Sequence, residues 1–116
     1  MCGRFTQRSD AKALVKAFGV AEVPKVEARY NVAPTQDILG VLEQGDGREA
    51  KFFKWGLVPS WAKDTSVGAR MINARAETVG EKPAFRQAFK QRRCIIPADG
   101  FYEWVRPASC VGDCLA

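Results

Sequence analysis

The chain has 116 residues, which is enough for one domain with a hydrophobic core and too few for two. Hydrophobic residues make up 47% and charged residues 27%, a composition that excludes a disordered chain and a membrane-spanning one. The net charge of +5 suits a polyanionic partner, and the absence of histidine removes the commonest general acid and base from any catalytic site.

Cys2 directly follows Met1, and a small second residue favours removal of the initiator methionine. An N-terminal cysteine carries an α-amine and a thiol that are both partly deprotonated near neutral pH. With an aldehyde, the amine forms an imine and the thiol closes onto the imine carbon, which gives a stable thiazolidine. Taken alone, the position of Cys2 leaves open that it is an accident of the start site.

The N-terminal residues contain no apolar segment of the kind found in signal peptides, so we expect a cytoplasmic protein with reduced thiols and no contact with membranes. The four cysteines are spaced unlike a disulfide framework. Cys110 and Cys114 could hold zinc, but no second cysteine pair or histidine lies near them in the sequence. We therefore expect no metal and no cofactor.

The first third of the chain predicts a helix and then an extended segment. Ser9 can cap a helix that ends near Phe18, because apolar residues follow at helical spacing and Gly19 stops the helix. Residues 29–35 predict an extended segment that ends in a turn.

Residues 37–42 and 50–55 predict the two strands of a β-hairpin, which the sequence Gly-Asp-Gly at 45–47 closes. Gly56 and Pro59 then break the second strand into a loop that carries Trp61, and we expect this loop at the surface.

The second half of the chain predicts short strands around one helix. Residues 71–75 are typical of a short buried strand, and Pro83 begins a helix that ends near Arg93. Residues 94–97 and 101–105 predict two strands joined by a turn at 98–100, because Asp-Gly favours turns. Residues 106–116 show neither helical nor strand periodicity.

Much of the positive charge is concentrated in and just before the second predicted helix. Such clustering favours contact with phosphates, and the alternative is a solvated helix face. The basic residues of this cluster are Arg70, Arg75, Lys82, Arg86, Lys90, Arg92 and Arg93.

Five sequence blocks occur in a fixed order along the chain. They are MCGRF at 1–5, YNVAPT at 30–35, WGLVPSWA at 55–62, INARAET at 72–78 and PADGFYEW at 97–104. With this ordered set, the chain closely resembles the SOS response-associated peptidase family, also called abasic site processing proteins, from Cys2 to Trp104.

The resemblance implies an α+β fold with a mixed, bifurcated, barrel-like β-sheet, flanking helices and a positively charged groove for single-stranded DNA. It implies that the N-terminal cysteine condenses with the aldehyde of an abasic site in single-stranded DNA. The resulting thiazolidine cross-link protects the damaged DNA. Autopeptidase-type removal of Met1, a hydrolase and lyase-type enzyme of the SOS response, and a location at the DNA of the nucleoid are further implications.

Three residues match catalytic positions of the family. Cys2 matches the nucleophile, and Asn73 matches an asparagine that positions the sugar, where an amide both donates and accepts without titrating. Glu103 matches an active-site glutamate that could move protons during opening of the sugar ring. Without the resemblance, Asn73 could be a satisfied strand-end amide, and strand alternation with its aromatic neighbours could make Glu103 simply the solvent-facing residue.

Four residues match DNA-binding positions. Arg4 and Arg75 match arginines that bind phosphates beside the lesion, and the guanidinium fork suits phosphate oxygens. Pro34 and Trp61 match apolar residues that wedge against bases where the strand kinks. The alternatives are ordinary surface charges and a partly buried loop anchor. For Trp55, which follows two phenylalanines, we favour a position in the core.

The chain departs from the family after the last block. Members continue with further strands and a His-x-Arg-Met-Pro motif, whose histidine assists ring opening and release of the cross-link, whereas this chain has no histidine. We expect a truncated or frame-shifted member with a family domain at 1–105, an unmatched tail at 106–116 and a fold that is incomplete at its C-terminal end. Without the further strands of the family, the sheet would have unpaired, exposed edges.

Two other functions fit the sequence. One is a noncovalent module that binds single-stranded nucleic acid, in which the basic residues and Trp61 act and Cys2 is incidental. The other is a nonfunctional fragment, which would lack a cooperative unfolding transition.

Overall fold

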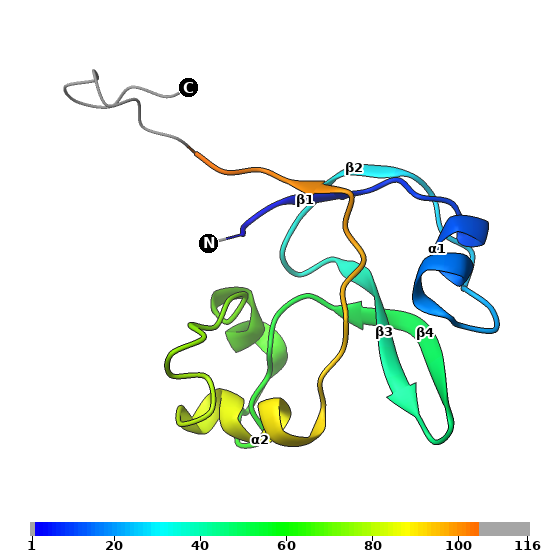
Figure 1. The fold of residues 1–116 in the computed structure, drawn as a ribbon. Helices are drawn as coiled ribbons and strands as arrows, with labels where there is room; N and C mark the ends of the chain where they lie inside the picture. The colour runs from blue at the N-terminus through cyan, green and yellow to red at the C-terminus, as the bar shows by residue number, and fades with distance from the viewer. Residues whose placement is uncertain (1, 105–116) are drawn as a thin grey trace.

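The structure, a computed structural model, describes residues 2–104. The elements in chain order are β1 (Phe5–Gln7), α1 (Ala11–Phe18), β2 (Arg29–Val32), β3 (Asp37–Gln44), β4 (Gly47–Lys54), the 3₁₀ helix η1 (Thr65–Arg70), α2 (Pro83–Gln91) and β5 (Gly100–Phe101) (Figure 1). The predicted α+β class is confirmed. Removal of Met1, the strand end at 105, and the tail 106–116 with Cys110 and Cys114 lie outside the described residues.

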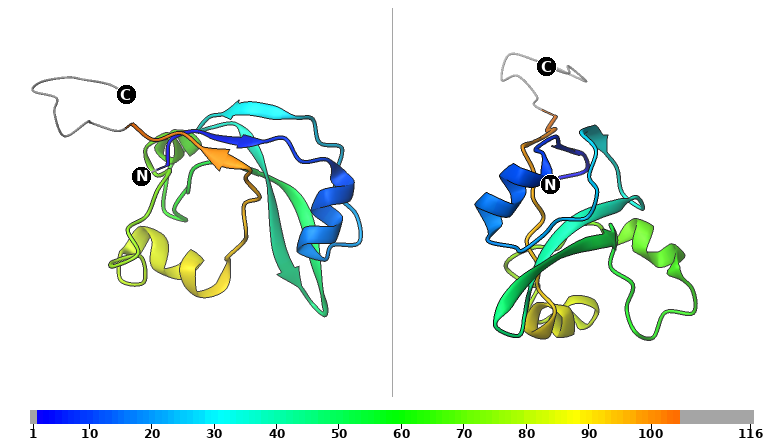
Figure 2. Two further views of the ribbon diagram at one scale, coloured as in Figure 1. Left: turned by 45° about the horizontal axis from the view of Figure 1, so that its top comes forward. Right: turned by 90° about the vertical axis from the view of Figure 1, so that its right-hand side faces the viewer.

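β1 is the central strand of a three-stranded antiparallel sheet with the order β2-β1-β5. Phe5 of β1 lies opposite Val32 of β2 on one side and opposite Phe101 of β5 on the other. β3 and β4 form a second, two-stranded antiparallel sheet, and Figure 2 shows both sheets from two further sides. Within residues 2–104 these sheets stay separate and open, so the predicted barrel-like sheet does not close here.

The β3–β4 hairpin confirms the predicted pair of strands. Pairing runs from Asp37 opposite Lys54 to Gln44 opposite Gly47, so both strands reach closer to the turn than predicted. Gly45 in the turn has a φ of 57°, in the left-handed region that glycine adopts without steric cost. The ladder can therefore continue up to a tight turn.

β3 separates two hydrophobic clusters. Side chains alternate between the two faces of a strand, so neighbouring β3 residues enter different clusters. Leu39 and Val41 pack with Leu14 of α1, whereas Ile38 packs with Phe5 of β1. Burial on both faces explains why four consecutive residues, 38–41, are buried in a strand of an otherwise open sheet.

Asp10, and not Ser9 as predicted, caps α1. The Asp10 carboxylate accepts a hydrogen bond from the backbone N–H of Ala13 at 2.8 Å. Ser9 instead donates its hydroxyl to the carboxylate of Asp99, a contact that no local sequence signal predicts. The predicted end of the helix is confirmed, because Gly19 closes it with a φ of 64°.

The strand predicted at 71–75 is wrong, because these residues follow η1 without regular structure. The strand predicted at 94–97 is reduced to an isolated bridge between Ile95 and Val41 of β3. The predicted turn at 98–100 does not fold residues 101–104 back onto 94–97. β5 pairs with β1 instead.

Asp99 explains this change of partner. Its carboxylate accepts hydrogen bonds from the backbone N–H groups of Arg8 and Ser9, just after β1. The backbone N–H of Asp99 donates a hydrogen bond to the backbone carbonyl oxygen of Thr6 at 2.9 Å. Together these contacts hold the segment beside β1, so the next residues pair with β1.

The predicted second helix is confirmed as α2, which begins at Pro83 and ends at Gln91, two residues before the predicted end. The loop that carries Trp61 is exposed, as predicted. Among residues 2–104, no helix has the length and apolar character needed to cross a membrane.

Candidate active site

Cys2 lies three residues before Phe5, where β1 begins, and its side chain is partly buried. It packs against the cluster of Phe5, Val32 and Ile38. Its thiol contacts the backbone carbonyl oxygen of Arg4 at 3.6 Å. The predicted nucleophile is therefore held against the sheet by the first residues of the chain.

Asn73 contacts Cys2 directly, although 71 positions separate the two residues. The Asn73 Nδ2 group donates a hydrogen bond to the backbone carbonyl oxygen of Cys2 at 2.7 Å. The amide is uncharged, so this contact does not depend on pH in the neutral range. The contact holds the main chain of Cys2 from a segment that is distant in the sequence.

The segment before Asn73 is itself held by the residues that follow β4. The backbone N–H of Leu57 donates to Met71 at 2.9 Å, and the Trp55 indole N–H donates to the backbone of Ile72 at 3.0 Å. The Trp55 ring packs on Phe5 with centroids 5.4 Å apart. Trp55 was expected in the core and is partly buried against the cluster of Phe5, Val32 and Ile38. Its ring links β1 to the segment of Asn73.

Gly56 permits this arrangement. Its φ of 136° lies where side chains are strained, and a Cβ atom there would lie 2.3 Å from the backbone oxygen of Gly68. Two glycines therefore let the loop after β4 pass directly against η1.

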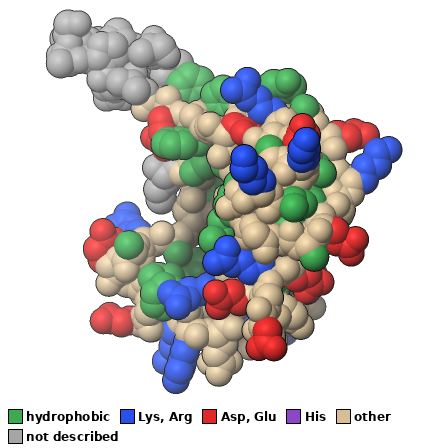
Figure 3. Space-filling model, turned by 45° about the vertical axis from the view of Figure 1, so that its right-hand side comes forward, with side chains coloured by type: hydrophobic (Ala, Val, Ile, Leu, Met, Phe, Trp, Pro, Cys, Tyr) green, Lys and Arg blue, Asp and Glu red, His purple; other side chains and the backbone are tan. Residues whose placement is uncertain are grey.

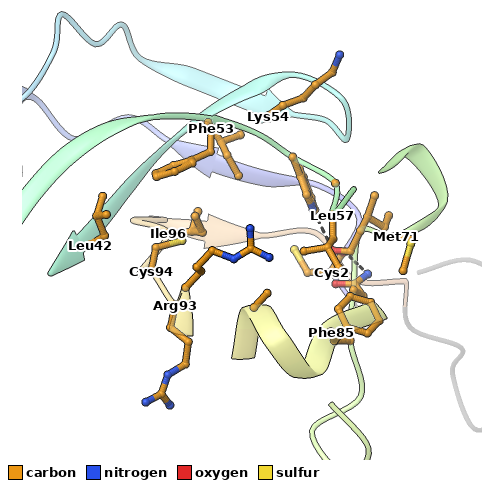
Figure 4. Close-up of a pocket in the computed structure, with 18 of the residues that line it drawn as sticks. Cys2, Leu42, Phe53, Lys54, Leu57, Met71, Phe85, Arg93, Cys94 and Ile96 are labelled. Carbon is orange, nitrogen blue, oxygen red and sulfur yellow. Dashed lines mark hydrogen bonds between the residues drawn. The ribbon is translucent and has the colours of Figure 1, made fainter. Parts of the chain in front are cut away.

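Cys2, Asn73 and Glu103 all line one cavity of about 1050 Å³. Figure 4 shows Cys2 at one end, near Met71, and Leu42 toward the other end. Figure 3 shows a hollow on one face of the molecule, with hydrophobic side chains inside and basic side chains along its edge. The structure thus brings the three predicted catalytic residues to one site, and their catalytic roles stay predictions.

Glu103 reaches the cavity from the residues that follow β5. The backbone N–H of Tyr102 donates to Arg4 at 3.0 Å, and the Tyr102 hydroxyl donates to the backbone oxygen of Tyr30 at 2.8 Å. These contacts hold the segment beside β1 and β2. Glu103 is exposed to solvent and also lines the cavity. The sequence left open whether it is a solvent-facing residue or a residue of the active site, and its position in the structure is compatible with both.

Arg4 and Arg75 are exposed and lie outside the cavity lining. The Arg4 guanidinium donates to the Asn31 side-chain oxygen at 3.1 Å. Arg75 begins a turn in which its carbonyl oxygen accepts from Thr78 and Val79. Both guanidinium groups can therefore reach solvent and anions, and their binding of phosphate stays a prediction.

Pro34 and Trp61 also lie outside the cavity that contains Cys2. Pro34 is partly buried, next to Thr35, whose backbone N–H donates to Trp55 at 3.0 Å. Trp61 is 64% exposed, so most of its ring is open to solvent, and the alternative of a partly buried loop anchor stays open. An exposed tryptophan suits a ligand with a flat aromatic face.

Basic residues that we did not assign to the site also line the cavity. Lys51 and Lys54 come from β4, and Arg92 and Arg93 follow α2. The two arginines belong to the basic cluster at 70–93, and this clustering was the sequence signal that could have assigned them to the site. Nothing in the sequence marked the two lysines as site residues, because charged side chains are common on exposed strands.

Cys94 is a second thiol in the cavity lining. Burial raises the pKa of the Cys94 thiol, which lowers its thiolate fraction near neutral pH. Among residues 2–104, no three or more of the cysteine and acidic side chains gather in a way that could hold a metal ion.

The SOS response associated peptidase (SRAP) family model matches residues 1–111 of the chain. The chain belongs to the SRAP family. A Bacillus subtilis relative, abasic site processing protein YoaM, is 50% identical over 109 residues, which cover 91% of this chain and 48% of that protein. The Escherichia coli abasic site processing protein YedK is 34% identical over 110 residues, which cover 90% of this chain and 48% of YedK.

A crystal structure of a Bordetella bronchiseptica protein is similar in fold to this chain. Its TM-score is 0.70 at 26% identity, and the match covers 89% of this chain and 51% of that one. The chain thus spans about half the length of the relatives it matches.

Proposed function

We propose that this SRAP chain captures abasic sites in single-stranded DNA as a covalent thiazolidine at Cys2. The contact between Asn73 Nδ2 and the Cys2 carbonyl oxygen carries the proposal, because the side chain expected beside the sugar bonds directly to the main chain of the expected nucleophile. The names of the relatives as abasic site processing proteins support the substrate class.

The chemistry begins when Met1 is removed and the α-amine of Cys2 becomes available. The amine adds to the aldehyde of the ring-opened deoxyribose and loses water to form an imine. The thiolate then adds to the imine carbon, and the nitrogen takes up a proton to complete the thiazolidine. One water leaves, and no oxidant or metal is required.

Asn73 and Glu103 have separate roles in this proposal. Asn73 holds the main chain of Cys2 so that the amine and thiol face the aldehyde from a fixed position. Glu103, in the same cavity, accepts protons from the amine and returns one to the ring oxygen as the sugar opens. A carboxylate is suited to this task in a chain without histidine.

The DNA strand binds across the exposed basic and aromatic residues around the cavity. Arg4 and Arg75 bind phosphates beside the lesion, and Pro34 and Trp61 contact bases where the strand bends. Because these contacts use the backbone and the flat faces of bases, binding tolerates different sequences.

The enzyme class and location follow from the same proposal. The hydrolase activity is the autopeptidase-type removal of Met1, which exposes Cys2. The lyase-type activity consists of opening the deoxyribose ring and releasing the cross-link. The protein acts in the cytoplasm at the DNA of the nucleoid, in the SOS response.

A single experiment tests capture. The purified protein is incubated with a single-stranded oligonucleotide that contains one abasic site, and the products are separated on a denaturing gel. We expect a shifted band that disappears when methoxyamine blocks the aldehyde. A complex that forms in native gels with blocked and unblocked DNA alike, and never survives denaturation, would instead establish the noncovalent module, which the exposed Trp61 also supports.

A further inference from the structure

The cavity that contains Cys2 is larger than the sugar that the proposed function places in it. Its volume of about 1050 Å³ is at the upper limit of the range for small-ligand sites. A ring-opened abasic sugar is small and polar, and a phosphate flanks it on each side. Figure 4 shows Cys2 at one end of the cavity and Leu42 toward the other end. Most of the cavity therefore lies away from Cys2 and has no role in the capture of a sugar.

One wall of this cavity is the apolar face of the β3–β4 hairpin. Side chains alternate between the faces of a strand, so Ile38 and Leu42 share one face of β3, and both line the cavity. Phe53 of β4 lies opposite Ile38 and lines the cavity too. At Gly40, a Cβ atom would lie 2.7 Å from the Phe53 ring and 3.5 Å from Ile96. Because Gly40 has no side chain, the ring and Ile96 can lie close to β3, and the space in front of them stays open.

The wall near Cys2 is also apolar. Phe85 comes from α2 and Met71 follows η1, and Figure 4 shows both near Cys2. Phe53, Phe85 and Met71 are each only partly buried, and no residue of α2 is buried. These side chains therefore leave apolar surface uncovered in the cavity. An apolar ligand that covers this surface removes it from water, which favours binding.

We propose that the cavity also accepts free aliphatic aldehydes with an unbranched chain and that Cys2 captures them, an inference that rests on the proposed thiazolidine chemistry of Cys2. The aldehyde carbon meets the α-amine and the thiol of Cys2, and the alkyl chain extends along the apolar walls toward Phe53 and Ile96. A nucleophile at one end of an apolar cavity suits a ligand that is reactive at one end and apolar along the rest.

The covalent step has the same balance as the capture of abasic DNA. The amine nitrogen bonds to the carbonyl carbon, and water leaves as the imine forms. The thiol sulfur then bonds to the imine carbon, and its proton goes to the nitrogen. The product is the protein plus the aldehyde less one water. The walls act on the alkyl chain alone, so they should discriminate between aldehydes by chain length.

A comparison of propanal with octanal tests this discrimination. The protein without Met1 is incubated with each aldehyde, and intact-mass analysis after denaturation gives the rate of adduct formation. The peptide Cys-Gly-Arg-Phe, which corresponds to residues 2–5, carries the same terminal groups without the cavity. Cys2→Ala, measured in parallel, identifies any added mass that comes from imines on lysines.

We expect the octanal-to-propanal rate ratio of the protein to exceed that of the peptide by at least about tenfold. Burial of one methylene favours binding by about fourfold, and octanal has more methylenes to bury. A protein ratio equal to that of the peptide would overturn the inference, because the walls would then have no effect on the alkyl chain.

Ile96→Asn makes the cavity wall polar without adding a charge, so it should bring the ratio close to that of the peptide. Ile95→Asn is the matched control, because Ile95 is also exposed but lies outside this cavity lining, and it should keep the high ratio. Far-UV circular dichroism verifies that both variants are folded. A high ratio that persists in folded Ile96→Asn would show that the alkyl chain does not bind along this wall.

The gel with the abasic oligonucleotide, run on the same protein preparation, separates this inference from the proposed function. A DNA adduct together with a peptide-like ratio would overturn only the capture of aliphatic aldehydes. A high ratio without a DNA adduct would overturn the capture of abasic DNA and support the site for the alkyl chain. No adduct with DNA or with either aldehyde would overturn both.

Discussion

The side-chain amide of Asn73 donates a 2.7 Å hydrogen bond to the backbone carbonyl oxygen of Cys2, across 71 positions of sequence. The contact joins the first residues of the chain to a segment without regular structure. It makes the geometry of the N-terminal nucleophile dependent on a distant loop.

We expect Asn73→Ala to slow adduct formation by about 10²-fold, because a misplaced nucleophile loses the benefit of orientation. Single-turnover time courses on denaturing gels measure the rate. Asn73→Asp keeps the size but lacks the N–H donor, so it should be similarly slow. A normal rate in both variants would remove Asn73 from the positioning of Cys2.

Cys2→Ala should abolish the adduct, whereas Cys94→Ala should leave the yield unchanged. Both thiols line the cavity, but only Cys2 can combine a thiol with an α-amine. Burial also raises the pKa of Cys94, which disfavours its thiolate. Intact-mass analysis measures the yield, and an adduct that persists in Cys2→Ala after denaturation contradicts the mechanism.

Arg4→Ala and Arg75→Ala should each weaken binding to intact and abasic single strands alike. Loss of one phosphate contact should also flatten the slope of log affinity against log salt by about 0.7. Fluorescence anisotropy titrations at several salt concentrations measure both effects. Lys12→Ala, on the exposed side of α1, is the matched control, and slopes equal to that of Lys12→Ala would place both arginines outside the interface.

The Asp99 contact should make stability depend on acid pH. The hydroxyl of Ser9, and then the backbone N–H of Arg8, lower the pKa of Asp99 in the folded chain. The stabilisation is therefore complete above about pH 4, the range of an unfolded aspartate, and is lost as the pH falls through the lower folded value.

Asp99→Asn should remove that dependence and cost at most about 1 kcal/mol at neutral pH, because solvent screens this exposed carboxylate. Urea unfolding at pH values between about 2.5 and 7 measures the free energy of unfolding. Asp46→Asn, in the turn of the β3–β4 hairpin, is the control. Parallel pH profiles for Asp99→Asn and the parent chain would show that the contact contributes nothing.

The absence of histidine predicts a slow reaction. Imine formation and ring closure need mainly a deprotonated amine and thiol, whereas ring opening and release also need a proton donor. A version extended with the C-terminal strands and histidine motif of the family should form and release the adduct faster, by about 10²–10⁴-fold. Equal rates with and without the extension would show that Glu103 suffices for proton transfer.

Local sequence signals were sufficient to predict those helix ends and turns that depend only on residues close together in the chain. Gly19 ended α1, Pro83 began α2, and the glycines at 45 and 47 closed the hairpin, because each acts through the backbone of its own turn. The ordered blocks also identified the family that the model match later showed.

Tertiary structure decided what depends on contacts between distant segments. Asp99 binds Ser9 from 90 positions away, which displaced the predicted cap to Asp10 and turned a predicted hairpin into the pairing of β5 with β1. The same kind of contact brings Asn73 to Cys2. Such bonds depend on how the sheets and loops pack together, and neither residue propensity nor spacing along the chain encodes that packing in any single segment.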